Sequence, residues 1–238
     1  MVGARVVLPS VSRFTVRFTI VYEDDTLIAV DKAAGVLTVP TPRRERNTLV
    51  DLVSAHVRRR VIVVHRLDRD TSGVLVFAKS EVAARALMDD WHRHKAERRY
   101  DAVVHGAPTR DEGEVRQHLA TDARTLDRRV VRAEAGELAI TRYRVVERVR
   151  GAALLDVALE TGRRNQIRVA LASLGHPILG DARYARGQRP HPGWPRDLLG
   201  LHARTLAVRH PSTGAPVVLA APTPGAFLRF LDAARARR

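Results

Sequence analysis

The chain has 238 residues, of which 45% are hydrophobic and 28% are charged, and its formal net charge is +15. These values are those of a folded globular protein with one large domain or two small ones. The lack of cysteine excludes disulfides, thiolate metal sites and cysteine nucleophiles, and no apolar run approaches the ~18 residues that a membrane-spanning helix needs.

Short apolar runs with β-branched residues predict the strands. Two of the runs flank Glu-Asp-Asp-Thr and two flank His-Pro-Ser-Thr-Gly, so a hairpin is expected near each end of the chain. The alternation of Phe14, Val16, Phe18 and Ile20 predicts that the first core strand starts near residue 14. In chain order, the predicted strands span residues 20–22, 27–30, 61–64, 74–78, 100–105, 139–146, 153–159, 201–208 and 217–220.

Apolar stripes at helical spacing predict helices between these strands. Asn47 and Ser80 are the expected N-caps of the first two helices, and Gly175 fits the position that follows the third. The helices are expected after Asn47 and over residues 81–95, 166–174 and 227–237. Strands outnumber helices, and several form adjacent pairs. The sequence therefore predicts an α+β fold with a mixed, largely antiparallel central sheet flanked by helices.

The excess of positive charge favours a polyanionic partner. Of the 41 basic residues, 38 are arginine, a side chain that forks onto phosphate and stacks on bases. Codon composition is an alternative origin of this arginine bias. No long amphipathic helix carries a basic face opposite bulky apolar residues, so nucleic acid is favoured over a membrane surface.

The segment VVHRLDRDTSGVLVFAKS, residues 63–80, holds a charged cluster between two predicted strands. The Thr-Ser-Gly that ends the cluster indicates a tight turn. A junction between strand and turn can hold a reactive side chain rigidly at a surface. On spacing alone, a plain charged loop remains the alternative, and neither Asp68 nor Asp70 is singled out as the reactive group.

A second charged cluster lies in ETGRRNQIRVALASLGHPILGD, residues 160–181. If the segment is helical, Arg164 and Arg168 share one face near the positive end of the helix, where like charges and cations are disfavoured. Two cations at this unfavourable position indicate a site that holds an anion, either a phosphate or a carboxylate from elsewhere in the fold. An arginine-rich surface is the alternative.

Other kinds of catalytic site have little support. His92 and His94 would point to different sides of a helix, and the remaining histidines lack ligand spacing, so no metal site is predicted. The sequence contains neither a G-x-S-x-G nucleophile elbow nor a G-x-x-x-x-G-K-[ST] phosphate loop.

Five blocks of the sequence match the motifs of one enzyme family. They are IVYEDDTLIAVDKAAG at residues 20–35, HRLDRDTSG at 65–73, RRYDAVVHG at 98–106, TGRRNQIRVALASLGHPILGD at 161–181 and LHARTLAVRHPSTGAPVVLAAPTP at 201–224. The second block closely resembles the H-R-L-D-x-x-T-S-G signature of the pseudouridine synthases that modify large-subunit ribosomal RNA and tRNA. Five blocks in the family's order make a specific signal, which displaces the plain-loop interpretation.

The resemblance implies the pseudouridine synthase fold and an isomerase that acts on RNA without a cofactor. In the implied reaction the N-glycosidic bond of a uridine breaks, the uracil turns, and a carbon–carbon bond forms at carbon 5. The resemblance further implies that residues 1–13 are an N-terminal extension and that residues 14–238 form the catalytic domain. Because the first core strand is expected to start near residue 14, we expect no room for the additional N-terminal RNA-binding domain that many relatives carry, and we expect the catalytic domain itself to hold the RNA.

The resemblance also assigns roles to individual residues. Asp68, rather than Asp70, matches the catalytic aspartate, which would attack the anomeric carbon or remove the 2′ proton. Arg168 would pair with Asp68 and keep it ionised. Tyr100 would stack on the target uracil and assist proton removal late in the reaction. Arg66 would enter the RNA stack where the uridine leaves it.

Five further residues are candidates for binding or positioning the RNA. Among them, His65 is expected to be structural or to contact RNA rather than to carry protons. The candidates are Lys32, His65, Arg163, Asn165 and Gln166. Leu67 is expected in the core. Departures from the family pattern at Ala33, Arg164, Asn165 and Ala170 leave the three implied catalytic residues in place.

The sequence also yields expectations about the setting of the protein. We expect an rRNA or tRNA substrate, no membrane, no obligate protein partner, a monomer and a cytoplasmic location. The sequences of the divergent loops that would select the RNA do not identify the target. These loops are expected at residues 40–46, 110–129 and 183–194.

Two other functions remain as alternatives. One is a non-catalytic RNA-binding or RNA-folding protein that kept the fold, although binding alone needs no buried carboxylate. The other is an aspartate-dependent glycosidase or hydrolase, which needs two carboxylates roughly 5–10 Å apart. Asp68 and Asp70 could supply that pair.

Overall fold

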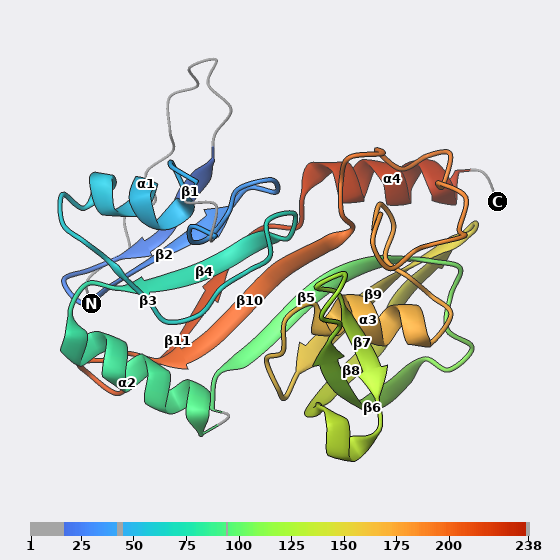
Figure 1. Ribbon diagram of the computed structural model, residues 1–238. Coiled ribbons are helices and arrows are strands. Elements are labelled where there is room, and N and C mark those ends of the chain that lie inside the picture. Colours follow the sequence, from blue (N-terminus) through green and yellow to red (C-terminus); the bar gives the residue numbers. More distant parts are fainter. Residues whose placement is uncertain (1–16, 42–44, 94, 237–238) are drawn as a thin grey trace.

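The computed structural model describes residues 17–41, 45–93 and 95–236, which form one long sheet with helices on its faces (Figure 1). The strands are β1 (Phe18–Glu23), β2 (Leu27–Lys32), β3 (Ile62–Val63), β4 (Ser72–Ala78), β5 (Glu97–His105), β6 (Glu112–Thr121), β7 (Arg128–Val131), β8 (Glu137–Val149), β9 (Ala152–Leu159), β10 (Leu201–Arg209) and β11 (Pro216–Ala220). The helices are α1 (Leu49–His56), α2 (Glu81–His92), the short 3-10 helix η1 (Ala133–Ala135), α3 (Gln166–Ser173) and α4 (Gly225–Arg235).

The sheet runs in the order β1-β2-β4-β10-β5-β9-β8-β6-β7, with β3 paired to β4 and β11 paired to β10. All of these pairings are antiparallel except that of β4 with β10. Figure 1 shows β10 and β5 in the middle, between an end that carries α1 and α2 and an end that carries α3 and α4. The predicted α+β class and the mixed, largely antiparallel sheet are confirmed.

Alternate residues of the strands enter different cores, as the pleat of a strand requires. Ile28 and Val30 of β2 join the cluster that contains residues of α1 and α3, whereas Leu27 and Ala29 join the cluster that contains residues of α2. A third cluster packs α4 against β5, β8 and β9. The predicted site residue Tyr100 and the predicted core residue Leu67 belong to the cluster of α1 and α3, which fixes the face of the sheet on which the site lies.

The helices form close to where the sequence predicts them, with small differences at their ends. Ser80 caps α2 by accepting a hydrogen bond from the backbone of Ala83 at 3.2 Å, but the helix ends at His92 rather than near residue 95. The N-cap of α1 is Thr48, not Asn47, because Asn47 has a left-handed φ of 59° and lies outside the helix. Asp51 completes this cap by accepting from the backbone of Thr48 at 2.9 Å.

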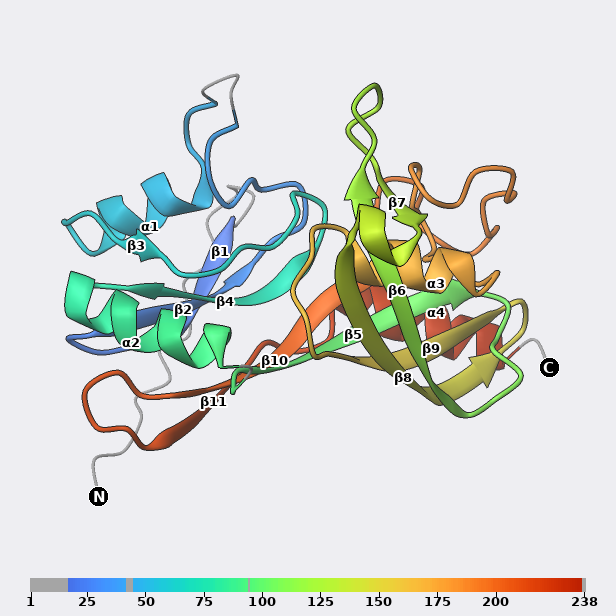
Figure 2. The same cartoon turned by 60° about the horizontal axis from the view of Figure 1, so that its bottom comes forward.

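One predicted loop, residues 110–129, is wrong, because it contains β6 and the start of β7. In Figure 2 this hairpin stands by α3, which contacts β6, β7 and β8. The side chains of β6 are mostly polar, and only Gln117 and Leu119 among them are buried, so the segment lacks the apolar run by which the other strands are recognised.

Two predictions about the N-terminus lie outside the described residues. These are the extension over residues 1–13 and the alternation of Phe14 and Val16, while Phe18 begins β1. The assignment of residues 14–238 to one domain stays a prediction. Over the described residues, no helix has the length and apolar character needed to cross a membrane.

Candidate active site

The loop between β3 and β4, residues 64–71, carries most of the H-R-L-D-x-x-T-S-G signature. Contacts of His65 and Leu67 hold it in place. His65 accepts a hydrogen bond through Nε2 from the backbone N–H of Val76 at 3.1 Å, and its ring stacks on Trp91 with centroids 4.4 Å apart. The hydroxyl of Thr38 lies 2.8 Å from the carbonyl oxygen of Leu67 and 3.3 Å from its N–H. Leu67 itself is buried, as predicted.

The end of this loop is tied to the turn after β2. The carbonyl oxygen of Arg69 accepts from the Lys32 ammonium at 2.9 Å and from the backbone of Gly35 at 2.8 Å. Gly73, the second residue of β4, has a φ of +116°, and a Cβ there would lie 2.2 Å from the carbonyl oxygen of Ala203 in β10. Only glycine allows so close an approach, which sets the loop directly beside the central strands.

Lys32 has no exposed surface at all. Its ammonium donates to the carbonyl oxygens of Ala33, Val36 and Arg69 at 2.9–3.0 Å and so joins two loops. Burial lowers the pKa of Lys32 to about 8, against the opposing effect of Asp70 and other nearby carboxylates. A direct contact with RNA, as the sequence suggests for Lys32, would require the two loops to separate.

Asp68 lies at the middle of the loop with 24% of its side chain exposed, and one carboxylate oxygen is 3.8 Å from Nη1 of Arg168. Burial raises the pKa of Asp68, and Arg168, Arg66 and Arg164 oppose this effect. Asp70 is different, because its side chain is 47% exposed and pairs with the neighbouring Arg69. The two aspartates are therefore in distinct environments.

The residues before α3 form a compact turn around a buried amide. Gln166 accepts through Oε1 from the hydroxyl of Thr161 at 2.8 Å and from the backbone of Arg163 at 2.9 Å, and its Nε2 donates to the carbonyl of Ile140 at 3.0 Å. Asn165 has a left-handed φ of 55° and donates to the hydroxyl of Tyr184 at 3.0 Å. Both side chains thus hold the turn.

Arg164 and Arg168 do not share a helical face. Arg164 precedes the N-cap of α3 and bonds to the carbonyl of Leu126, whereas Arg168 lies inside the helix with a side chain only 11% exposed. The anion that the sequence predicts for this cluster is a carboxylate. Arg168 has two such partners, Asp181 as well as the expected Asp68. Asp181 accepts from its Nε at 2.7 Å and from its Nη2 at 2.8 Å, while Asp68 lies beside Nη1.

Tyr100 lies in β5, where it pairs with Ala203 of β10 and Val157 of β9. Its side chain belongs to the core, yet it also lines the cleft into which Asp68 faces. Burial raises the pKa of the Tyr100 hydroxyl, so it stays protonated in the neutral range. No hydrogen bond to this hydroxyl occurs within the described residues.

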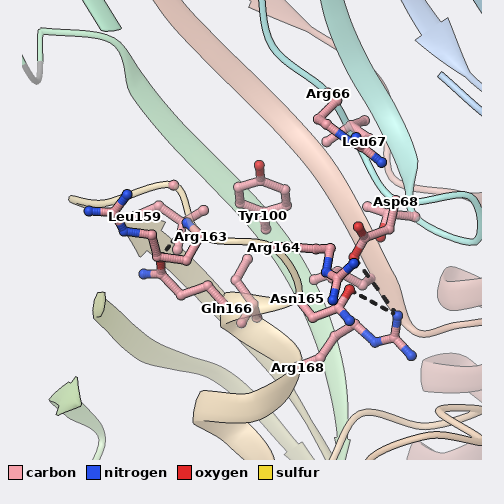
Figure 3. A pocket seen from close by; sticks show the side chains of 14 residues that line it. Arg66, Leu67, Asp68, Tyr100, Leu159, Arg163, Arg164, Asn165, Gln166 and Arg168 are labelled. Carbon is pink, nitrogen blue, oxygen red and sulfur yellow. Dashed lines mark hydrogen bonds and ion pairs between the residues drawn. The ribbon is translucent and has the colours of Figure 1, made fainter. Parts of the chain in front are cut away.

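These elements enclose a cleft of about 180 Å³ (Figure 3). Asp68 and Arg168 lie on one side of it, Tyr100 in the middle, and Leu159 and Arg163 on the other side. The cleft also includes Arg66, which is exposed, and Thr71, but not Asp70. Arg163 is held by Glu137 through Nη1 at 2.9 Å. One carboxylate, several cations and an aromatic ring therefore share one cavity.

The fold and the cleft match a known family over most of the chain. The family described as RNA pseudouridylate synthase matches residues 26–173. The chain belongs to this family. It is therefore an isomerase whose substrate is RNA.

Individual relatives of this pseudouridine synthase agree with the family match. It is 36% identical to the ribosomal large subunit pseudouridine synthase D of Haemophilus influenzae over 233 residues, which cover 91% of this chain and 71% of that protein. It is 34% identical to an uncharacterised RNA pseudouridine synthase of Bacillus subtilis over 223 residues, covering 90% of this chain and 71% of that one. The structure of human RNA pseudouridylate synthase domain containing 1 has a TM-score of 0.75 at 24% identity, covering 94% of this chain and 90% of that chain, and it shows the same fold.

Sequence reasoning about this synthase missed Asp181 and Thr38. Asp181 ends the Gly-His-Pro-Ile-Leu-Gly-Asp segment that follows α3, and the need of Arg168 for an anion was the signal that could have pointed to it. Thr38 had no such signal, because a threonine in a loop is ordinary. Within the described ranges, no group of three or more histidine or acidic residues could hold a metal ion.

Proposed function

We propose that this pseudouridine synthase isomerises specific uridines of ribosomal or transfer RNA, with Asp68 as its catalytic carboxylate and without a cofactor. The observation that carries the proposal is the position of Asp68, which enters the cleft beside Arg168 and opposite Tyr100. Relatives named for the large ribosomal subunit support rRNA as the first substrate to test.

The chemistry needs an ionised carboxylate at the sugar. In one route, Asp68 bonds to the anomeric carbon as the glycosidic bond breaks, and the electron pair of that bond leaves with uracil. In the other route, Asp68 removes the 2′ proton and a glycal forms as uracil leaves. In both, the uracil turns and its carbon 5 bonds to the anomeric carbon. In the first route the bond between Asp68 and the anomeric carbon breaks at this step and frees the carboxylate, and in the second route Asp68 returns the proton to carbon 2′. The proton on carbon 5 is then lost, N1 takes up a proton, and the product is an isomer of the substrate.

The neighbours of Asp68 suit both routes. Arg168 stabilises the ionised form of Asp68 from 3.8 Å, although burial still leaves the pKa of this carboxyl raised. The ring of Tyr100 offers a flat apolar surface to a uracil in the cleft. A uridine must leave its base stack to reach this position, and the exposed Arg66 at the cleft is suited to fill the space it leaves.

The other candidate residues divide into two groups. Arg163 lines the cleft and is placed to contact RNA. Lys32, His65, Asn165 and Gln166 make intramolecular hydrogen bonds that hold the loops of the site, and we propose positioning roles for them. A two-carboxylate hydrolase is less well supported, because Asp70 pairs with Arg69 and does not line the cleft.

The charge of +15 supports RNA binding by the catalytic domain itself. If about six phosphates are neutralised, binding to a single strand should weaken roughly as the fourth power of the salt concentration.

The large exposed apolar side chains lie on separate elements, among them Val82 on α2 and Val218 on β11, and this scatter supports a monomer. We place the protein in the cytoplasm, where rRNA and tRNA are found. Light scattering and cell fractionation test these two proposals.

Tritium release tests the proposed reaction. Transcripts of rRNA and tRNA carry tritium at carbon 5 of uridine, and loss of that hydrogen accompanies the new bond at carbon 5. We expect the protein to release tritium from one of the two RNA classes without added cofactor, and chemical mapping then locates the product. Tight, salt-sensitive binding of both RNAs with no release would favour the non-catalytic RNA-binding alternative and contradict the proposal.

A further inference from the structure

A second hollow adjoins the cleft of Asp68 and has a volume of about 600 Å³, compared with about 180 Å³ for the cleft. The two cavities share Arg66, Tyr100, Leu159, Gly162 and Arg163. The hollow extends from these residues to the end of α2, so it lies on the far side of Tyr100 from Arg168. An RNA strand with one nucleotide in the cleft can therefore continue into the hollow.

The hollow is cationic. Its lining includes three arginines, and none of the described residues that line it is acidic. The cleft of Asp68, by contrast, has a carboxylate among its lining residues. An anion would thus meet attraction in the hollow without a competing carboxylate in its wall.

Arg98 is an incompletely hydrogen-bonded cation in the wall of the hollow. Its Nε is buried without a hydrogen bond, and its Nη2 reaches the carbonyl oxygens of Leu159 and Glu160 only at 3.4 and 3.5 Å, near the limit for a hydrogen bond. No carboxylate forms an ion pair with it in the described part of the chain. Burial lowers the pKa of Arg98, against the opposing effect of Tyr100.

The wall of the hollow is also aromatic. Trp91 of α2 stacks on His65, and Tyr100 closes the side towards the cleft. The pKa of His65 is lowered to about 3 by burial and by Arg98, so His65 is neutral and adds no charge to this stack. Aromatic side chains beside an unpaired guanidinium are the combination that binds a base together with its phosphate.

We propose that this hollow binds the nucleotide next to the target uridine, with its base against Trp91 and its phosphodiester at Arg98. The inference rests on the proposed function, since it places the target uridine in the adjoining cleft. It adds a second nucleotide subsite, so that the enzyme holds a short unstacked stretch of RNA rather than a single extruded base.

The fluorescence of Trp91 gives a direct binding test. The chain has two tryptophans, and Trp194→Phe leaves Trp91 as the sole tryptophan, whose emission is followed with excitation at a wavelength that tyrosine does not absorb. Titration with the uridine trinucleotide at low salt should quench this emission. In the same background, Arg98→Met should weaken binding of the trinucleotide about tenfold, as expected for one lost charged phosphate contact.

Arg99→Met is the matched control. Arg99 is the next residue of β5, pairs with Asp156 at 2.7 Å and does not line the hollow, yet its replacement removes the same net charge. We expect it to weaken binding less than threefold. Equal weakening by the two variants, or emission of Trp91 that the trinucleotide leaves unchanged, would overturn the subsite. Equal quenching by oligoglutamate would overturn its assignment to a nucleotide.

Thermal unfolding separates binding from folding. Arg98→Met removes a half-buried cation without an ion-pair partner, so its melting temperature should equal or exceed that of the wild type. A large fall in melting temperature together with lost binding would mean that Arg98 is structural, and would overturn its role at a phosphate.

Tritium release distinguishes failure of the subsite from failure of the proposed function. If the wild type releases tritium and Arg98→Met raises the KM for RNA no more than Arg99→Met does, the subsite is wrong and the proposed function stands. If no RNA releases tritium, the proposed function fails, and the trinucleotide titration still decides whether the hollow binds a nucleotide.

Discussion

Asp181 holds Arg168 by two hydrogen bonds, from Nε at 2.7 Å and from Nη2 at 2.8 Å, and leaves Nη1 to face Asp68 at 3.8 Å. The same carboxylate also accepts from the backbone N–H groups of Arg183 and Tyr184 at 2.9 and 3.0 Å. A bidentate pair fixes the plane of the guanidinium. Asp181 thus orients the guanidinium of Arg168 so that its Nη1 faces Asp68, which makes Asp181 a positioning residue.

Replacing Asp181 by asparagine should lower both stability and activity. The variant leaves Arg168 buried without its main counter-ion, and loss of one partner of a buried pair costs about 3–5 kcal/mol. Asp111→Asn is the control, because Asp111 is 81% exposed in its pair with Arg148, and such pairs are worth at most about 1 kcal/mol. Urea unfolding of both variants measures the difference, and equal losses would contradict the buried role.

A pH profile tests whether Asp181 acts through Arg168. With Asp181 neutral, the full charge of Arg168 acts on Asp68 and should lower the pKa of that carboxyl. The acid limb of the rate profile of Asp181→Asn should therefore move to lower pH, which a purely structural loss would not cause. An unchanged or higher acid limb would count against the positioning role.

Asp68 should reduce the stability of the folded protein at neutral pH. Because burial raises the pKa of Asp68 above its usual value of about 3.9, its contribution to stability is present at lower pH and is lost as the pH rises through the raised pKa. Asp68→Asn should therefore melt above the wild type at pH 7 and with it near pH 3.5. Asp70→Asn, at an exposed pair, should change stability by less than about 1 kcal/mol at pH 7. A lower melting temperature for Asp68→Asn at pH 7 would refute this prediction.

His65 should remain neutral throughout the working range of the enzyme. Burial and Arg98 lower its pKa to about 3, so the stability that its neutral ring provides is present above about pH 6.5 and is lost as the pH falls towards 3. A histidine NMR titration should find a ring that does not protonate down to pH 5 and whose resonance His65→Phe removes. Titration of this ring near pH 6.5 would show that its acceptor bond to Val76 is absent.

Lys32→Met should destabilise the protein by about 3 kcal/mol or more. The change leaves three carbonyl groups without their donor, and each hydrogen bond to a charged group is worth about 1.5–3 kcal/mol. The exposed Lys95 offers a matched control, whose change to methionine should stay within about 0.5 kcal/mol. Chemical unfolding compares them. If Lys32→Met lowered the free energy of unfolding no more than Lys95→Met does, the hydrogen bonds of Lys32 would not stabilise the two loops.

The sequence was sufficient for the elements and the central residues where the signal is local. The strands with continuous apolar runs and the cap at Ser80 were predicted close to their observed limits. Asp68, Tyr100 and Arg168 were assigned by resemblance to family motifs, and the fold brings all three to one cleft. The hairpin of β6 and β7 was missed because its polar faces lack a strand-like apolar pattern.

The remaining features depend on long-range contacts that no local pattern carries. The sequence names Lys32 as a candidate for binding or positioning the RNA, but it does not show that three carbonyl groups from two loops converge around its ammonium. The pairing of Arg168 with Asp181 depends on how the chain turns back after α3. Spacing could not distinguish Asp68 from Asp70, whereas the different exposure and partners of the two carboxylates in the fold do.

The most direct test of the account compares tritium release by the wild type, Asp68→Asn and Asp70→Asn on the same labelled transcripts. The variants remove one carboxylate each, two residues apart in one loop. The account predicts release by the wild type, loss of release by a factor of about 10³ or more for Asp68→Asn, and near-normal release for Asp70→Asn. Retained activity in Asp68→Asn, or its loss in Asp70→Asn with the fold intact, would contradict Asp68 as the catalytic carboxylate.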